Sequence, residues 1–420
     1  MVYKINTAKC KEWLHFAVLA ITIGVFAVFF AKSCEIAFRV FMYMFLHVHY
    51  WILVIIPFGF FIVTYLIKNY FPEAEGGGIP QALALNHTKN VDKISRFFVP
   101  KVILGKFIFV VLGTALGATI GREGPTVQIG ATIMILGKKT ASNAKKKFLL
   151  TVGAAAGLAA AFNTPIGGVV FAFEELSRGA SQKLIMPRVT GIAIAGIVAM
   201  LLAGNYSYFG IVAQDLLEYN WKIFIIALII GVCAALCCYL FSKVVYYFTL
   251  SASSMINRWR KSHIYINSLV FGLLVAAIGL ISHGLSFGNG YVESKETLSS
   301  GISLPHAYFI YKMLGSLFST ASGVPGGYFA TSLSIGGGIG SFIHDIYSVA
   351  NIQQYCLLGM VAFLASVTRA PITSIVMVFQ VTSSQMFTLP IMLSALTATW
   401  VSELMSRGIY EYQIEGYLKD

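Results

Sequence analysis

Long apolar runs, separated by short polar or glycine-rich segments, dominate the pattern of the chain. The runs are Trp13–Ala31, Trp51–Ile67, Val102–Ile120, Ile185–Ala203, Trp221–Leu240, Ile264–Ile281 and Met386–Val401. Several of them approach the ~20 residues that cross a bilayer as a helix. The pattern therefore predicts an all-α polytopic membrane protein. The first run is long and lacks a clear small-residue cleavage site, so we expect a retained first helix rather than a removed signal.

The composition strengthens this prediction. The 420 residues are 57% hydrophobic and only 11% charged, and the mean hydropathy is +0.77. A soluble domain contains about 25% charged residues, because it must cover its exterior with polar groups. Contact with lipid removes that requirement. We therefore expect the bilayer to be the chain's main surroundings.

The net charge of +13 raises the question of nucleic-acid binding. However, the basic residues gather at the ends of apolar runs, which is typical of membrane proteins. The densest group consists of Lys138, Lys139, Lys145, Lys146 and Lys147, as expected of a loop under the positive-inside rule. We expect no nucleic-acid partner. The six cysteines form no CxxC pair and mostly lie in apolar stretches, where cysteine behaves as a small hydrophobe. We therefore expect no disulfide, metal site or cofactor.

The chain matches itself at an offset of 206 residues, the difference between Pro371 and Pro165. The identical pairs are Gly153/Gly359, Ala156/Ala362, Leu158/Leu364, Ala159/Ala365, Pro165/Pro371, Ile166/Ile372, Val170/Val376 and Phe173/Phe379. Repeated halves are common in transporters, which often relate them by a pseudo-twofold axis in the membrane plane. A bias from apolar composition is the alternative. We expect one transmembrane transport domain over residues 1–420, with halves at about 10–210 and 220–412 and no soluble domain.

Glycine-rich breaks interrupt the apolar runs at Glu75–Pro80, Gly121–Pro125 and Gly323–Thr331. Glycine permits unusual dihedrals and proline suits the first helical turn, so we expect a helix to start at each break. Irregular backbone at membrane depth is tolerated only where it is buried in protein or lines a cavity. Exposed N–H groups at a helix start also form an anion site. The alternative is that these glycines only allow close helix packing.

Few carboxylates lie in the apolar regions, and an ionisable residue there is by default a functional candidate. Glu123 lies at an expected helix start, where its carboxylate would compete with an anion, or would be protonated and swing away. Glu175 ends an apolar run and could take a proton at the opposite aqueous boundary. The alternatives are a simple Arg122–Glu123 ion pair and interfacial capping by Glu174 and Glu175.

These residues resemble the CLC family of chloride channels and proton-coupled anion exchangers. Gly121–Pro125 matches the family's GREGP signature without change, Gly76–Pro80 is similar to its GSGIP segment, and Gly327–Thr331 is similar to its GxFxP segment. The resemblance continues through Phe162–Pro165, Phe173–Glu175 and Arg369–Pro371 and ends at Tyr410, so it covers nearly the whole chain.

The resemblance implies two inverted-topology halves of tilted, partly discontinuous helices, assembled as a homodimer with one pathway per subunit. By matching position, Glu123 resembles the gating glutamate and Glu175 the inner proton-transfer glutamate. The implied anion-binding residues are Gly76, Gly77, Gly78, Gly124, Tyr328, Phe329, Ala330 and, through its hydroxyl, Tyr410. Arg122 and Lys106 would support them.

The family's channels usually lack an acid at the Glu175 position. The resemblance therefore implies a secondary-active antiporter that exchanges chloride, or a similar small monovalent anion, for protons. It implies a multi-pass protein of a prokaryotic inner membrane. Since the chain stops soon after Tyr410, we expect no paired regulatory domain.

Three positions qualify the resemblance. Gly77 replaces the serine of GSGIP and removes a hydroxyl donor from the expected anion site, so a preference for nitrate stays open. Thr331 replaces the proline of GxFxP and could alter that helix start. Tyr412 is an alternative to Tyr410. Pro125 is retained, whereas the fluoride-exporting branch departs from the signature at that residue, so fluoride ranks low.

The sequence also raises two other functions. A passive chloride channel on the same scaffold stays open. An intramembrane hydrolase would need a nucleophile or a metal, and serines and histidines are present (His263, His283, His306 and His344). The chain contains neither a Gly-x-Ser-x-Gly elbow nor a His-Glu-x-x-His zinc pattern. We therefore expect that the protein is not an enzyme.

Overall fold

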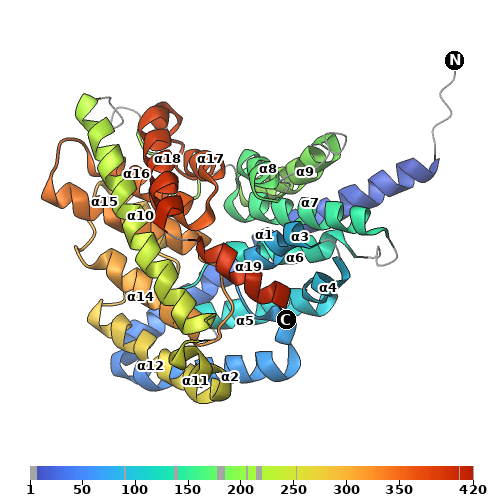
Figure 1. The fold of residues 1–420 in the computed structure, drawn as a ribbon, viewed down its shortest axis with the longest axis horizontal. Helices are drawn as coiled ribbons and strands as arrows, with labels where there is room; N and C mark the ends of the chain where they lie inside the picture. The colour runs from blue at the N-terminus through green and yellow to red at the C-terminus, as the bar shows by residue number, and fades with distance from the viewer. Residues whose placement is uncertain are drawn as a thin grey trace.

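The computed structural model describes residues 7–88, 91–136, 141–176, 185–204, 207–213, 220–251, 253–405 and 407–419. Helices account for almost all of the regular structure in these ranges (Figure 1). The first group is α1 (Thr7–Val48), α2 (Ile52–Tyr70), α3 (Ile79–His87), α4 (Val91–Ser95), α5 (Pro100–Ala115), α6 (Glu123–Met134), α7 (Asn143–Phe162), α8 (Pro165–Glu174) and α9 (Ile185–Ala203). The second group is α10 (Trp221–Thr249), α11 (Met255–Ser262), α12 (Ile264–Ile281), α13 (Tyr291–Ser300), α14 (Tyr308–Ala321), α15 (Phe329–Ile346), α16 (Ile352–Thr368), α17 (Pro371–Thr382), α18 (Thr388–Met405) and α19 (Ile409–Lys419).

The predicted membrane class is confirmed. Within the described residues, five helical segments are long and apolar enough to cross a bilayer: Cys10–Tyr70, Met186–Ala203, Trp221–Thr249, Ile264–Ile281 and Gln385–Met405. Large apolar side chains remain exposed along them, including Leu46, Trp51, Leu201 and Trp400, as expected where lipid covers the surface. The six cysteines are free thiols.

Several predicted boundaries differ from the structure: the helices that contain the runs Trp13–Ala31 and Trp221–Leu240 continue to Val48 and Thr249. Two further differences have a local cause. The run Val102–Ile120 forms a helix only as far as Ala115, because Gly117 adopts a left-handed φ of 73° against the ring of Phe41. Lys145, Lys146 and Lys147 lie in the first turns of α7 rather than in a loop, because Ser142 accepts a hydrogen bond from the Lys145 amide (3.4 Å) and starts the helix there. Lys138 and Lys139 lie outside the described residues.

The 206-residue offset is visible in the helix boundaries. Helices α6 and α15 begin at Glu123 and Phe329, and α8 and α17 begin at Pro165 and Pro371. The residues that end α7 and α16, Asn163 and Arg369, both adopt left-handed backbone with φ of 59° and 60°. Lys106 and Lys312 obey the same offset, and both are fully buried. The sequence repeat is therefore a repeat of local structure.

The equivalent glycines of the two repeats contact each other. Gly121 donates its amide to the Gly327 carbonyl (2.8 Å), and Gly327 returns the bond to Gly121 (2.9 Å) as an antiparallel bridge. When two equivalent elements exchange the same hydrogen bond, a local twofold axis relates them. The two repeats therefore meet in opposite directions at the breaks that precede α6 and α15.

A second reciprocal contact joins α8 and α17. The carboxylate of Glu174 accepts hydrogen bonds from the Ile372 and Thr373 amides (3.0 and 2.6 Å) at the start of α17. Its equivalent, Gln380, accepts a bond from the Gly167 amide (2.6 Å) at the start of α8. Each helix thus caps the other's first turn, and the capping role considered for Glu174 is confirmed.

Helix α19 crosses from one group of helices to the other (Figure 1), and it packs against both α3 and α10. This placement brings the C-terminal segment to the breaks of the first half. The remaining helices enclose α6, α7, α15 and α16, whose side chains are almost all buried.

Removal of the Glu174 cap should destabilise the protein measurably. We expect Glu174→Ala to cost about 1–2 kcal/mol, because two amides at a helix start lose a carboxylate acceptor. Glu296→Ala, which changes an exposed glutamate of α13, should stay within about 0.5 kcal/mol of wild type. Thermal unfolding of purified protein in detergent compares the two, and equal melting temperatures would show that the cap is unimportant.

Candidate ion-coupling site

The three predicted helix breaks converge in one place. The position that a Cβ would occupy at Gly77, before α3, lies 3.3 Å from the carbonyl oxygen of Gly326, before α15. The corresponding position at Gly124, in the first turn of α6, lies 3.3 Å from the Gly327 Cα. Backbone therefore meets backbone without intervening side chains. The glycines permit this close packing, and as a result the starts of α3, α6 and α15 lie next to one another.

The first break is held open by left-handed glycines and a buried lysine. Gly76 and Gly78 have φ of 84° and 97°, a conformation that other residues rarely adopt. The Lys106 ammonium donates hydrogen bonds to the carbonyls of Gly76 (2.5 Å) and Glu75 (3.3 Å). Lys106 therefore stabilises the loop before α3 by donating hydrogen bonds to its backbone carbonyls.

Glu123 is completely buried at the start of α6. Its Oε1 accepts a hydrogen bond from the Tyr208 hydroxyl (3.3 Å), and its carboxylate lies against the backbone amides of Arg122 and Glu123. A side chain at Gly121 would collide with its Oε2. A carboxylate thus rests on the positive end of its own helix, in the position where that helix would hold an anion.

Arg122 is not a simple ion-pair partner of Glu123. Its Nε lies 4.0 Å from Glu123 Oε1, the outer limit of an ion pair. Its Nη1 instead donates a 2.7 Å hydrogen bond to the Ala31 carbonyl of α1, and its guanidinium lies 5.8 Å from the centroid of the Tyr208 ring. Arg122 therefore anchors the α6 start to α1 and contributes positive potential at a distance.

At the start of α15 the side chains pack into the protein. The backbone is therefore the part that meets the other two helix starts. Tyr328 is the N-cap residue, and its ring packs edge-on against Phe241 (5.6 Å). The Phe329 ring lies 5.2 Å from that of Phe162, and Ala330 is buried. Thr331 donates its hydroxyl to the Tyr328 carbonyl (2.9 Å), and α15 begins at Phe329 as expected. The missing proline therefore leaves this helix start in place.

Of the two candidate tyrosines in α19, Tyr410 reaches the site. It is buried, and the electrostatic interactions of its hydroxyl extend to Tyr328, Glu175 and Glu123. Tyr412 points elsewhere, because its ring stacks at 4.5 Å on that of Tyr246. Tyr410 thus lies near Glu123, near Glu175 and near Tyr328 at the start of α15.

Glu175 follows the last residue of α8 and borders a cavity of about 360 Å³. This cavity, here called the vestibule, is lined by Leu83, His87, Glu175, Thr368, Arg369, Arg407, Tyr410, Glu411, Ile414, Glu415 and Leu418. Glu175 is only 7% exposed. Glu175 and Tyr410 both line the vestibule, whereas the neighbouring Glu174 is engaged with α17. The two adjacent glutamates therefore have different surroundings.

Two residues at the site were not predicted. Tyr208 is buried and contacts Glu123, and Asn289 donates its Nδ2 to the Tyr208 hydroxyl (3.3 Å). Tyr208 lies in a short segment, 207–213, whose position relative to α6 no sequence pattern indicates. Asn289 offered a signal, since Gly288-Asn289-Gly290 is a glycine-containing break directly before α13, like Gly76–Gly78 before α3.

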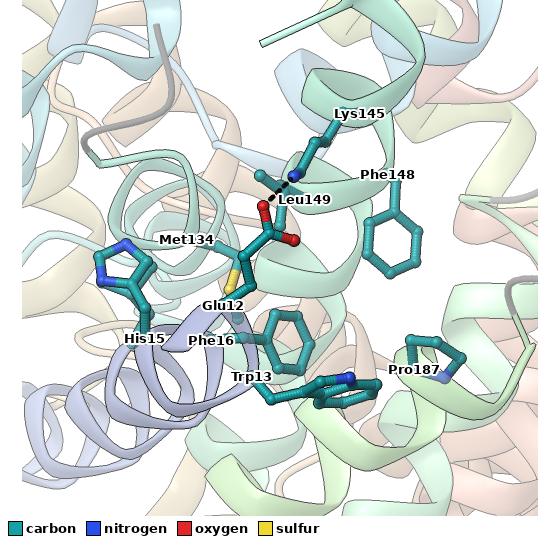
Figure 2. Close-up of a pocket in the computed structure, with 10 residues that line it drawn as sticks. Glu12, Trp13, His15, Phe16, Met134, Lys145, Phe148, Leu149 and Pro187 are labelled. Atoms are coloured by element: carbon teal, nitrogen blue, oxygen red, sulfur yellow. Dashed lines mark hydrogen bonds and ion pairs between the residues drawn. The ribbon is translucent and has the colours of Figure 1, made fainter. Parts of the chain in front are cut away.

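A separate cavity of about 370 Å³ lies where the start of α1 meets α7 and α9 (Figure 2). Its walls are mainly apolar, with Trp13, Phe16 and Phe148 among the lining residues, and the Glu12 carboxylate pairs with Lys145 (3.1 Å) at its edge. It includes none of the predicted site residues. The candidate ion-coupling site therefore consists of the converging helix starts and the vestibule.

Comparison with known proteins identifies the family of the chain. The sequence profile of the family described as "Voltage gated chloride channel" matches residues 58–403. The chain belongs to this family. Two relatives are named H(+)/Cl(-) exchange transporter ClcA. The protein from Citrobacter koseri is 31% identical over 360 residues, which cover 81% of this chain and 73% of that protein. The protein from Vibrio parahaemolyticus is 28% identical over 383 residues, covering 86% and 78%.

Solved structures show the same fold. A slow cyanobacterial Cl-/H+ antiporter aligns with a TM-score of 0.80 at 23% identity over 97% of this chain and 98% of that chain. A CLC-type fluoride/proton antiporter aligns with a TM-score of 0.80 at 20% identity over 98% and 99%. The predicted fold class, an all-α membrane protein with two inverted halves of partly discontinuous helices, is therefore confirmed. Because two antiporters of different anions fit equally well, the fold alone does not select the anion.

The close approach at Gly124 yields a prediction. A methyl group there would collide with the Gly77 carbonyl, so Gly124→Ala should separate the starts of α3 and α6 and weaken anion binding at least tenfold. Gly337→Ala is the matched control, because its Cβ would meet only ordinary contacts, the nearest being Met360 Cγ at 3.5 Å. Isothermal titration with chloride measures both variants, and undiminished binding by Gly124→Ala would contradict the proposed convergence.

Proposed function

We propose that this protein is a secondary-active antiporter that exchanges chloride, or a similar small monovalent anion, for protons. The observation that carries the proposal is the buried Glu123 carboxylate, which rests against the backbone amides that begin α6. The names of the two ClcA relatives support the same activity. No enzymatic activity is required to explain the site.

The proposed coupling rests on competition for one position. The positive ends of the helices at the starts of α3, α6 and α15 attract a negative charge. Ionised Glu123 is such a charge, so the carboxylate and the transported anion exclude each other there. Protonation removes the charge from Glu123 and allows it to leave. The anion can then enter, and the proton travels with the displaced side chain.

The proton also needs a route from Glu123 to the opposite aqueous boundary. We assign this role to Glu175, which borders the vestibule on the side where Tyr410 lies. Tyr410 lines the vestibule together with Glu175, and its hydroxyl interacts electrostatically with both Glu175 and Glu123, so it suits the role of an anion ligand. Anion and proton would thus share the region around Glu123 and separate near Tyr410.

The anion ligands are proposed on the same basis. Backbone of Gly76, Gly77, Gly78 and Gly124 and of Tyr328, Phe329 and Ala330 would surround the anion together with the Tyr410 hydroxyl. Main-chain dipoles hold an anion with moderate strength, and transport requires both capture and release. Gly77 supplies no hydroxyl where the family has serine. We propose chloride as the transported anion because the relatives are named for it.

The remaining proposals concern assembly and location. We propose a homodimer with one pathway in each subunit, in the inner membrane of a prokaryote, with the bilayer, chloride and protons as the partners. Exposed apolar residues on α9 and α18, such as Leu201 and Trp400, provide apolar surface for lipid or a second subunit.

The antiport mechanism predicts that Glu123→Gln abolishes proton flux. Glutamine has nearly the same shape but cannot ionise or carry a proton, so chloride flux should continue while proton pumping by a chloride gradient falls to background. Liposomes loaded with a pH indicator measure both. The reversal potential of the wild type should follow the pH gradient, and a wild type that ignores this gradient would instead be a channel. Coupling that persists in Glu123→Gln would refute the mechanism.

The Gly77 position yields a second prediction. We expect Gly77→Ser to change the chloride/nitrate flux ratio by about three- to tenfold in favour of chloride, because one added hydrogen bond to a charged group has that effect. The new Cβ would lie 3.3 Å from the Gly326 carbonyl, so Gly77→Ala controls for the added bulk. Flux assays with chloride, nitrate and fluoride compare the variants. A ratio equal to that of Gly77→Ala would place Gly77 outside the selectivity site.

A further inference from the structure

A chain of three hydrogen bonds runs from the start of α13 to Glu123. The Tyr291 amide donates to Asn289 Oδ1 (3.2 Å), Asn289 Nδ2 donates to the Tyr208 hydroxyl (3.3 Å), and the Tyr208 hydroxyl donates to Glu123 Oε1 (3.3 Å). None of these contacts follows from the family motifs.

The direction of every bond in this chain is determined. A backbone amide can only donate, so Asn289 must direct its oxygen toward Tyr291 and its NH2 group toward Tyr208. Tyr208 then accepts from Asn289, and its own proton is left for Glu123, whose ionised carboxylate can only accept. The positive end of α13 is thus connected to the carboxylate by aligned dipoles, which strengthen one another.

The residues of the chain are held rigidly. Gly288 and Gly290 adopt left-handed φ of 64° and 80° on either side of Asn289. The buried Lys312 ammonium donates hydrogen bonds to the carbonyls of Phe287 (2.6 Å) and Gly288 (3.4 Å) and lies 3.6 Å from Glu293. Lys312 thus supports this break as Lys106 supports the break before α3.

The Tyr208 side chain is also held in one position by its neighbours. Its ring packs edge-on against Phe162 (5.2 Å), Phe209 (4.9 Å) and Tyr291 (4.9 Å). The next residue, Phe209, donates its amide to the Val381 carbonyl of α17 (2.7 Å). The hydroxyl group is therefore placed by surrounding packing, and removing it would leave the ring contacts intact.

We propose that Tyr208 is a latch that holds the ionised Glu123 side chain in its anion-competing position, with Asn289 as the residue that positions it. The proposal rests on the proposed antiport function and deepens it. A donor that can bond only to the carboxylate in place stabilises the closed arrangement. The strength of the latch then determines how readily an anion displaces Glu123 without a proton, and so how tightly the two fluxes are coupled.

Other groups also act on Glu123 and are unchanged by the test. Arg122 lies beside it, Cys34 of α1 and Tyr410 of α19 interact with it electrostatically, and Lys106 of α5 points to the carbonyls of Glu75 and Gly76 instead. A variant that removes only the Tyr208 hydroxyl therefore isolates the latch.

The test measures chloride and proton flux in liposomes across pH for Tyr208→Phe. Loss of one hydrogen bond to a carboxylate should raise chloride flux at pH above 7 by about three- to tenfold and move the half-maximal pH upward by about half a unit to one unit. The number of chloride ions moved per proton should rise, because more anions pass without protonation of Glu123. Asn289→Ala should shift the profile in the same direction by a smaller amount.

Tyr291→Phe is the matched control, because it removes a phenol from the same aromatic cluster and should behave as wild type. A Tyr208→Phe profile identical to this control, or shifted toward acid, would overturn the latch. The Glu123→Ala background provides a further test, since there the hydroxyl of Tyr208 has no side-chain acceptor at position 123 and Tyr208→Phe should change nothing, and an equal increase in flux would also overturn it. Proton coupling that survives in Glu123→Gln alone would refute the antiport function, so the two failures are distinguishable.

Discussion

The structure depends on one constraint, which is that backbone N–H groups inside a membrane must find a partner. Most of the chain satisfies it by continuous helix. At the starts of α3, α6 and α15 the helices are broken, and the backbone of these breaks meets at Gly77, Gly124 and Gly327. Some of the amides find acceptors within the protein, since Gly78 donates to Gln81 Oε1 (2.8 Å) and Gly327 donates to the Gly121 carbonyl (2.9 Å). At the start of α6 the buried Glu123 carboxylate lies beside the amides of Arg122 and Glu123, in the kind of position that suits an anion.

The repeat supplies the framework that holds these breaks together. The Gly121–Gly327 bridge and the mutual caps of Glu174 and Gln380 join equivalent elements from the two halves. Symmetric contacts of this kind let the same sequence pattern stabilise both sides of an interface. The fully buried Lys106 and Lys312 each secure a glycine-containing loop in the same way. Charge in the membrane-embedded part is therefore used to hold backbone in place and not only to bind ions.

Selectivity and coupling then depend on few side chains. Because a chloride and a fluoride antiporter superpose on this chain equally well, anion preference must arise from local donors such as those at position 77. Coupling depends on how strongly the protein holds ionised Glu123 in place. The Glu123 carboxylate lies beside the amides that begin α6 and accepts a hydrogen bond from Tyr208, which Asn289 positions. We propose that these contacts make an anion-conducting fold an exchanger.

The sequence by itself determined the membrane class, the repeat and the helix starts, because hydrophobic length, self-similarity and glycine-proline breaks are local properties. It also singled out Glu123 and Glu175 through their charge in apolar surroundings, and the family motifs supplied Tyr410. Only the tertiary structure separated Tyr410 from Tyr412, assigned Glu174 to capping α17, and brought Tyr208 and Asn289 to Glu123. Those outcomes depend on which distant segments meet, and such long-range contacts leave no periodic or compositional pattern along the chain.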